Sequence, residues 1–443
     1  MTRVSFPEPP RADNYRASID GAIAYHATGS VSAIVGNRIE VRGLNVPVGA
    51  VCEIQTRGGQ RGAAKVIGFR DDSPILALMD EISSLASGDI VHLHSHSVNI
   101  RVGQELLGRV VDALGRPLDG RPLPPSLTPV SAEMHPPASL DRPPIDTVFE
   151  TGIRAVDGLL TCGLGQRLGI FAGAGAGKST LMGMLARNAK ADAIVIGLIG
   201  ERGREVREFI EHTLGKQGMR RSVLVVSTND QPATMRIQAA WTATAIASAL
   251  RSEGKNVVLF MDSITRFATA QREIGLAVGE PPTTRGYPPS VFSTLPRLVE
   301  QAGRTEHGSI TAFYSVLVDG DDNNEPISDS LRGLLDGHFI LSRKLGSEGH
   351  WPAIDILESL SRLQTKLIPG QSLAAASQLR KWLSDYRTNE DLINIGAYRQ
   401  GTNPELDRTI AMRPVLRQFL MQTSEEVAPI AKTLKTMQEM AAS

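Results

Sequence analysis

Cysteine and aromatic residues are scarce in this chain of 443 residues, which contains two cysteines and 5% Phe, Trp and Tyr. Cys52 and Cys162 lie in apolar or glycine-rich surroundings without the paired spacing of a metal site or a disulfide framework, so we expect neither. No apolar run reaches about 18 residues, and the N-terminus has no apolar signal core. We therefore expect no membrane-spanning helix and no secretion signal, and a reducing cytoplasm fits these features.

The chain also lacks net charge, because its 47 basic residues are matched by 47 acidic residues. A protein that binds nucleic acid through bulk charge carries an excess of basic residues, so this balance predicts no nucleic-acid partner. Hydrophobic residues make up 41% of the chain, which is ordinary for a globular protein. The length is sufficient for two or three domains.

Residues 25–97 read as short strands separated by turns. Gly36-Asn37 is a two-residue hairpin signal between strand-like segments at residues 30–35 and 38–42. Further strands are expected at residues 51–55, 63–69, 74–78 and 89–91. Several short strands at this spacing are typical of a small β-barrel.

Three histidines, His92, His94 and His96, alternate near the end of this region and share one face if the segment is a strand. Such a row can bind a metal ion, or it can be a solvated strand face near a domain boundary. We favour the solvated face and keep the metal site as the alternative.

Apolar runs alternate with helical patterns from about residue 150 to residue 365. Strands are expected at residues 168–171, 193–199, 223–227, 257–261, 310–316 and 339–341, with helices such as residues 203–214 and 232–252 between them. Buried strands separated by helices predict a parallel sheet covered on both faces. The proline-rich residues 122–144 are expected to wrap around this domain, and residues 371–443 read as largely helical.

The most informative stretch runs from Ala172 to Thr180, between an apolar strand and a helical pattern. A glycine-rich loop in this position turns consecutive backbone N–H groups toward one point, and the following helix adds its dipole, so the loop binds phosphate. The residues expected to contact nucleotide are Gly173, Ala174, Gly175, Ala176, Gly177, Lys178, Ser179 and Thr180. Lys178 reaches the terminal phosphates, and the Ser179 hydroxyl suits Mg²⁺. Ala172 replaces the first glycine of the pattern, and the alternative is a glycine-rich turn without a ligand.

Two other apolar runs end in carboxylates, Asp262 after residues 256–261 and Glu201 after residues 194–200. Ligands of a parallel sheet bind at the carboxyl ends of its strands. We therefore expect Asp262 to hold Mg²⁺ through water, and Glu201 to orient and polarise the attacking water. The alternatives are a helix N-cap for Asp262 and a surface ion pair for Glu201.

Two arginines accompany these carboxylates. Arg202 follows Glu201 directly, and Arg266 lies one turn beyond Asp262. Phosphoryl transfer needs positive charge on the developing oxygens, so both arginines are candidate catalytic residues. The alternative for Arg266 is a structural ion pair with Glu201 or Asp262.

Longer motifs resemble a known family, the rotary-type hexameric ATPases. Gly200-Glu201-Arg202-Gly203-Arg204-Glu205-Val206 is similar to their catalytic motif, and residues 352–361, followed by Arg362, are similar to their shared signature. Residues 270–277, 279–287 and 390–398 resemble the type III protein-export ATPases in particular. The similarity extends from about residue 98 to residue 421 and is weaker in the first 97 residues.

Together the patterns and the resemblance predict an α/β protein. An N-terminal small β-barrel with a short tail is expected in residues 1–97. A central RecA-like parallel-sheet nucleotide-binding domain is expected in residues 98–370, and a C-terminal helical domain in residues 371–443.

For the reaction, the resemblance implies ATP hydrolysis with Mg²⁺ in a homohexamer whose nucleotide sites lie between subunits. Lys178, Ser179, Glu201 and Asp262 would then belong to one subunit. Arg362 would reach in from the neighbouring subunit as an arginine finger. Trp351 stands where the family has a tyrosine that packs on adenine, and its larger ring suits the same contact.

For the biology, the resemblance implies that hydrolysis energises protein export through a type III apparatus, with the flagellar form favoured. It is coupled to release and unfolding of substrate–chaperone complexes. The implied partners are those complexes, a central coiled-coil stalk, a negative-regulator or stator protein, and the export gate at the membrane. The implied location is the cytoplasm, at the inner face of the cytoplasmic membrane.

Four alternatives remain for the function. An injectisome ATPase shares every motif, whereas a rotary F- or V-type catalytic subunit works beside a non-catalytic partner. One chain that carries both Glu201 and Arg362 favours a homo-oligomer instead. An RNA-dependent helicase would need a basic, aromatic-bearing surface in its first domain, whose only aromatics are Phe6, Tyr15, Tyr25 and Phe69. A non-catalytic nucleotide-binding subunit is disfavoured by the presence of Glu201.

Overall fold

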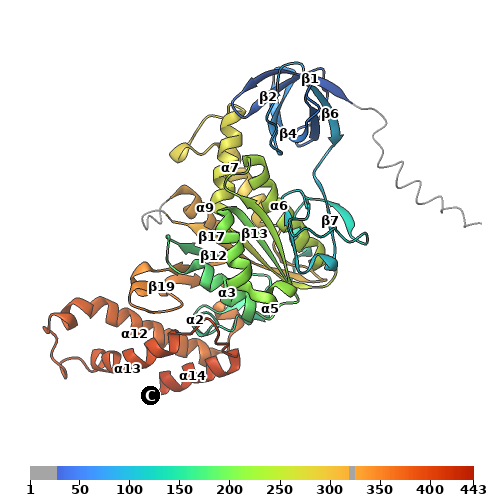
Figure 1. Ribbon diagram of the computed structural model, residues 1–443. Helices are drawn as coiled ribbons and strands as arrows, with labels where there is room; N and C mark the ends of the chain where they lie inside the picture. Colours follow the sequence, from blue (N-terminus) through green and yellow to red (C-terminus); the bar gives the residue numbers. More distant parts are fainter. Residues whose placement is uncertain (1–26, 319–324) are drawn as a thin grey trace, which may run out of the picture. The chain divides into compact units, whose positions relative to one another are not determined.

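The computed structural model describes residues 27–318 and 325–443, and the chain divides into two compact units, Met1–Val98 and Asn99–Ser443 (Figure 1). The N-terminal tail, with Phe6, Tyr15 and Tyr25, lies outside the described residues. In the described parts, no helix is both long enough and apolar enough to cross a membrane.

The first unit is a closed barrel with the strand order β1-β2-β5-β4-β3-β6, which confirms the predicted barrel. Its strands are β1 (Thr28–Val35), β2 (Arg38–Arg42), β3 (Val51–Gln55), β4 (Arg61–Arg70), β5 (Ser73–Leu78) and β6 (Ile90–Ser95). Ile39 and Val41 of β2 point into the barrel core, while the charged residues between them are more exposed. Period-two alternation therefore supplies the core of the barrel.

The histidine row lies on and just after β6, where His92 is half-buried and His94 and His96 are exposed. Among residues 27–318 and 325–443, no group of three His, Cys, Asp or Glu side chains is placed to hold a metal ion. The geometry therefore favours the solvated face over the metal site.

The second unit is built on a large sheet with the order β19-β18-β12-β17-β15-β13-β14-β8. These strands are β19 (Ile354–Ser361), β18 (Gly337–Leu341), β12 (Arg167–Ala172), β17 (Ser309–Leu317), β15 (Asn256–Asp262), β13 (Ala193–Glu201), β14 (Ser222–Thr228) and β8 (Arg109–Asp112), and β16 (Gly303–Arg304) pairs with β17. From β18 to β8 the neighbours run parallel, as predicted. The edge strands β8 and β19 were not predicted, and β19 runs antiparallel to β18.

Helices cover both faces of this sheet. The helices of this part of the chain are α2 (Arg154–Leu159), α3 (Lys178–Asn188), α4 (Gly203–Glu208), α5 (Gly215–Arg220), α6 (Ala233–Ser252), α7 (Ile264–Ala277), α8 (Pro289–Val299), α9 (Pro326–Leu334), α10 (Arg343–Ser347) and α11 (Gln364–Leu367). On β13, Ile194 and Ile196 share a core with Leu185 of α3, whereas Gly197 faces Ala243 of α6. Because alternate residues of the strand face opposite layers, both faces are apolar, as the continuous apolar runs predict.

Three smaller features complete the unit. The proline-rich segment contains β9 (Thr128–Ser131), which pairs with β7 (Asn99–Val102), and β10 (Val148–Phe149) pairs with β11 (Cys162–Gly163). The chain then ends in α12 (Gly370–Asn394), α13 (Pro404–Leu420) and α14 (Ile430–Ala442). Leu379, Phe419 and Met437 of these helices join the same core as the residues around β12, so the helices lie in one compact unit with the sheet.

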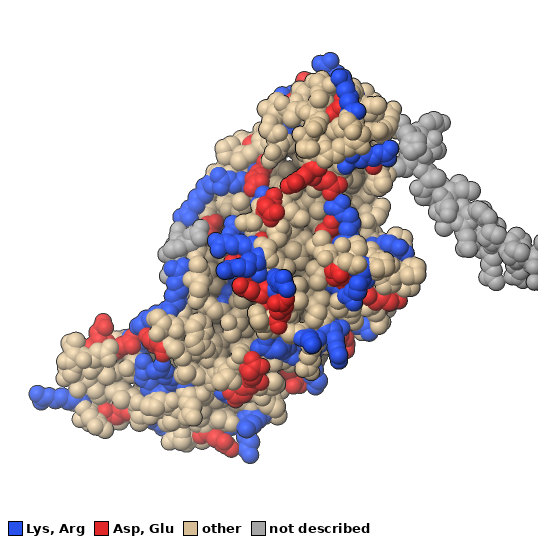
Figure 2. All heavy atoms as spheres, in the orientation of Figure 1, with Lys and Arg blue, Asp and Glu red and all other residues tan. Residues whose placement is uncertain are grey.

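Charged side chains are mixed by sign on the face drawn in Figure 2, where basic and acidic groups alternate over short distances. This is the surface expected from equal numbers of basic and acidic residues.

Candidate active site

The loop between β12 and α3 has the backbone that a phosphate cradle requires. Gly175 and Gly177 have φ angles of 79° and 85°, in the left-handed region that glycine adopts without strain. In the part of the chain that the structure describes, no side chain caps the start of α3, and its first turn contains no acidic residue. Ser179 and Thr180 are exposed there. The first N–H groups of α3 and its dipole are therefore available to an anion.

Three of the predicted residues, Lys178, Glu201 and Asp262, meet at the carboxyl edge of the sheet. Lys178 is the first residue of α3, and the two carboxylates are the last residues of the neighbouring strands β13 and β15. The Lys178 Nζ lies 2.5 Å from Asp262 Oδ1 and 3.7 Å from Glu201 Oε1. Their side chains are only 15%, 17% and 6% exposed, in the order Lys178, Glu201, Asp262. The cluster is thus an ion-paired group largely shielded from water.

The alternative position for Asp262, a helix N-cap, is occupied by the next residue. The Ser263 Oγ accepts a hydrogen bond from the backbone N–H of Arg266 at 3.3 Å and so caps α7. The carboxylate of Asp262 is therefore free of the capping role and faces Lys178.

The charge balance of the cluster is negative, because one ammonium group faces two carboxylates. Burial alone would lower the pKa of Lys178, but the charges of Asp262 and Glu201 outweigh it and raise that pKa. Lys178 therefore stays charged, and the remaining negative charge suits a divalent cation with oxygen ligands.

Glu201 is the titratable member of the cluster. Burial, followed by the negative charge of Asp262, raises the pKa of Glu201 to about 7, although Lys178 opposes the shift. Glu205, which the sequence interpretation did not single out, raises it further through a hydrogen bond and its own charge. Glu205 lies four residues after Glu201, on the first turn of α4. It belongs to the motif of residues 200–206, so this second carboxylate could have been found from the sequence. A carboxyl group that titrates near neutrality is matched to proton exchange with water.

The two arginines beside these carboxylates are exposed. Arg266 lies with its aliphatic stem over Gly200, where an added Cβ would come within 3.0 Å of the Arg266 Cβ. Within the described ranges, the guanidinium of Arg266 forms no ion pair with Glu201 or Asp262. Both carboxylates pair with Lys178 instead, so the structure does not contain the ion pair that was the alternative for Arg266. Arg202 pairs with Glu205 at 3.7 Å.

A short segment between β18 and β19 places two large side chains against the phosphate loop. A Cβ added to Gly177 would lie 2.3 Å from the Trp351 Cζ3, and one added to Gly173 would lie 2.4 Å from the Arg343 Nη2. Trp351 was predicted for the site and is 38% exposed. Arg343 was missed, although it follows a predicted strand that pairs with β12 and therefore emerges beside the loop.

Arg362 lies at the amino ends of the parallel strands, whereas the phosphate loop lies at their carboxyl ends. The strand β18 runs parallel to β12, and its last residue stands beside the start of the loop. The strand β19 returns antiparallel, so Ser361 pairs with Gly337 at the first position of β18. Arg362 follows, and its Nη2 donates to the carbonyl oxygen of Arg332 at 3.1 Å. The structure does not bring Arg362 and Lys178 together within one chain.

Known proteins are similar to this chain over most of its length. Residues 152–361 match the ATP synthase alpha/beta family, nucleotide-binding domain, and residues 368–439 match the T3SS EscN ATPase C-terminal domain. The flagellum-specific ATP synthase of Bacillus subtilis (strain 168) is 52% identical over 416 residues, which cover 94% of this chain and 95% of that protein. The type 3 secretion system ATPase of Xanthomonas euvesicatoria is 48% identical over 412 residues, which cover 92% and 93%.

A solved structure is also similar over most of this chain. The assembled ATPase EscN in complex with its central stalk EscO, from the enteropathogenic E. coli type III secretion system, has a TM-score of 0.86 and 43% identity. The match covers 93% of this chain and all of that one (100%).

A phosphate loop that faces two strand-end carboxylates across a lysine defines a nucleotide hydrolase of the phosphate-loop class. The comparisons give the family. The chain belongs to the type III protein-export ATPases, which confirms the resemblance of its motifs, and it is an ATPase.

The pKa of Glu201 leads to a pH prediction. Because Glu201 must be ionised to accept a proton and its pKa is about 7, kcat/KM for ATP should fall as the pH drops through this value. Glu205→Ala removes two contributions that raise the pKa, so the acid limb should move to lower pH, while Glu208→Ala on the same helix serves as the control. The measurement is the pH profile of kcat/KM. An acid limb that Glu205→Ala leaves in place would contradict this assignment.

Trp351 provides an optical prediction for nucleotide binding. The other two tryptophans, Trp241 and Trp382, are buried, so a change in emission on adding ADP should come from Trp351 and vanish in Trp351→Phe. Trp351→Ala should weaken ADP binding by about 1–3 kcal/mol, the scale of base–aromatic stacking. Unchanged emission at saturating ADP would count against contact with adenine.

Proposed function

We propose that this protein hydrolyses ATP to energise protein export through a type III apparatus, in its flagellar form. The observation that carries the catalytic part is the buried cluster in which Lys178 bridges Asp262 and Glu201 beside the uncapped start of α3. Membership of the export ATPase family supports the biological part.

Mg²⁺ fits the residues at this site. The exposed hydroxyl of Ser179 and the carboxylate of Asp262 would hold it, and the negative charge left in the cluster suits a cation. When bound, the metal ion would supply positive charge that offsets the charge of the phosphates. The nucleotide itself would lie on residues 173–180, with Trp351 against adenine.

Each protein group then has one task. When nucleotide binds, Lys178 leaves Asp262 and contacts the terminal phosphate, because the phosphate bears more negative charge than the carboxylate. Glu201 orients the attacking water and takes its proton. Arg202, Arg266 and Arg343 supply positive charge around the loop, and Arg343 already lies over Gly173.

Arg362 acts across a subunit interface in this proposal. Its position at the edge of the sheet remote from Lys178 supports a role in a neighbouring site, as an arginine finger that contributes about 10³–10⁵ in rate. Each site then needs two chains, and a closed ring of six identical subunits satisfies this requirement for every chain. The EscN relative is described as an assembled ATPase.

The remaining partners follow the same reasoning. The EscN relative binds a central stalk, EscO, and we propose an equivalent stalk for this chain. A stator or negative-regulator protein, the export gate and substrate–chaperone complexes would complete the machine, at the cytoplasmic face of the membrane. Relatives of both kinds, flagellar and type 3 secretion, are similar in identity, so an injectisome is the second candidate.

Complementation between two inactive variants tests this function. Lys178→Ala keeps a working finger and Arg362→Ala keeps a working cradle, so mixed rings contain some complete sites. Each variant alone should lack turnover and, in cells without this gene, should export no flagellar filament protein. Together they should restore part of both activities.

The readouts are phosphate release by purified mixtures and filament protein in the culture medium. If the two variants co-assemble, no ratio restores turnover, and the wild-type rate per chain stays constant down to monomeric protein, the finger does not act between subunits. Cells that stay motile but lose an injectisome's secreted proteins would assign the chain to the second candidate.

A further inference from the structure

We propose that Gln166, which is completely buried, is a positioning residue for Arg362. The proposal rests on the proposed role of Arg362 as the finger of a neighbouring site. Gln166 directly precedes β12, the strand that leads to the phosphate loop, so chain order alone would assign it to the cradle. Its hydrogen bonds assign it to the finger instead.

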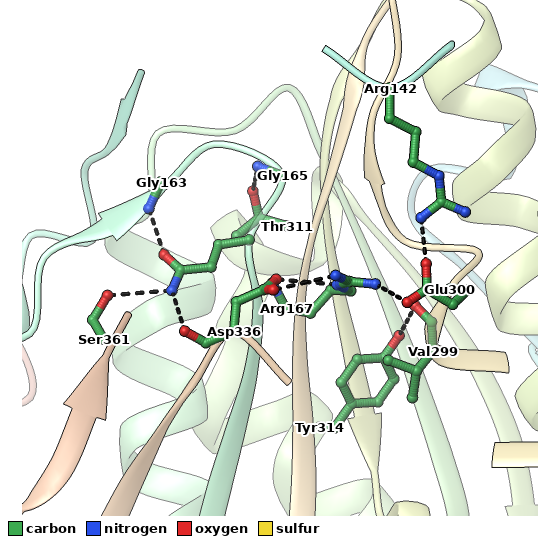
Figure 3. Close-up of polar contacts among 11 residues, drawn as sticks. Arg142, Gly163, Gly165, Arg167, Val299, Glu300, Thr311, Tyr314, Asp336 and Ser361 are labelled. Carbon is green, nitrogen blue, oxygen red and sulfur yellow. Dashed lines mark hydrogen bonds and ion pairs between the residues drawn. The ribbon is translucent and has the colours of Figure 1, made fainter. Parts of the chain in front are cut away.

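The amide of Gln166 joins the segments on either side of it. Its Oε1 accepts from the backbone N–H of Gly163 at 2.8 Å. Its Nε2 donates to the carbonyl oxygen of Asp336 at 3.1 Å and to the Ser361 Oγ at 3.2 Å (Figure 3). All the polar atoms of the amide are therefore engaged, and a buried network of this kind fixes one geometry.

The two acceptors of that amide lie at the start of Arg362, one bonded to its backbone and the other in the preceding residue. The carbonyl oxygen of Asp336 also accepts the backbone N–H of Arg362, at 3.0 Å. Ser361 precedes Arg362, and its hydroxyl donates to the carbonyl oxygen of Thr161 at 2.7 Å. Gln166 thus contacts the anchor of Arg362 and the residue before it, while Arg362 itself extends outward and is exposed.

Asp336 is itself held in place by charge. Arg167 donates to its carboxylate from the backbone N–H at 3.0 Å and from Nε at 3.1 Å, and also pairs with Glu300. Glu300 pairs in turn with Arg142 of the proline-rich segment, as Figure 3 shows. These contacts form one buried polar network. Gln166 and Ser361 lie at one end of it, and the ion pairs of Arg167 and Glu300 stabilise the other end.

Loss of the Gln166 amide should misplace the finger without disturbing the cradle. The backbone at Arg362 would lose the hydrogen bonds that Gln166 makes to Asp336 and Ser361. A small shift of this backbone is amplified along the arginine side chain. Misplacement of a catalytic group by about 1 Å can cost 10²-fold in rate. We expect Gln166→Met and Ser361→Ala to lower kcat by about 10- to 100-fold, with unchanged KM and unchanged ADP binding.

Mixed rings identify which half of the site each variant damages. Ser361→Ala or Gln166→Met should regain turnover when mixed with Lys178→Ala, which supplies a working finger. Neither should regain turnover with Arg362→Ala, which supplies only a working cradle. Thr311→Val is the matched control, because it deletes a 2.9 Å hydrogen bond from Gly165 in the same buried layer and should keep its kcat.

The outcomes separate this proposal from the proposed function. If Lys178→Ala and Arg362→Ala fail to complement each other, the trans finger itself fails. If they complement each other but the test variants are rescued by Arg362→Ala, Gln166 serves the cradle and the proposal is overturned. Wild-type kcat in folded Ser361→Ala, which removes a single oxygen atom, overturns it as well, and this variant decides the matter if Gln166→Met does not fold.

Discussion

Parallel pairing of the neighbouring strands β18, β12, β17, β15 and β13 determines where the phosphate loop and the two carboxylates of the site lie. Strands that run in one direction bring their last residues to one edge, so the phosphate loop, Glu201 and Asp262 meet although they are far apart in sequence. The proximity of two carboxylates is unfavourable by itself, and Lys178 offsets it. The same pairing places Arg362 at the opposite ends of the strands, away from Lys178.

The antiparallel strand β19 runs from the carboxyl ends of the parallel strands to their amino ends. It begins just after Trp351, against the phosphate loop, and ends at Ser361, against the buried layer of Gln166. Between these ends, Arg387 of α12 donates to both carboxylate oxygens of Asp355 at 2.7 Å. One strand therefore touches the cradle, the C-terminal helices and the support of Arg362. If Arg362 acts in the neighbouring site, as proposed above, β19 connects one nucleotide site with the next.

The strongly patterned parts of the fold could be predicted from the sequence. Apolar runs gave the inner strands, and the loop after residue 172 gave the cradle, because local chemistry determines both. The edge strands β8 and β19 could not be predicted, since short or half-exposed strands carry charged residues between apolar ones. Arg343 and Gln166 were missed for another reason. Their contacts come from strand register, which joins residues about 170–195 positions apart and leaves no local pattern.

In the proposed mechanism the buried cluster hydrolyses ATP, and Glu201 acts on water rather than on nucleotide. A single-turnover measurement of phosphate release by Glu201→Gln tests it most directly, with nucleotide binding followed by Trp351 emission. We expect the variant to bind Mg·ATP like the wild type and to release almost no phosphate. Phosphate release at a rate near that of the wild type would contradict it.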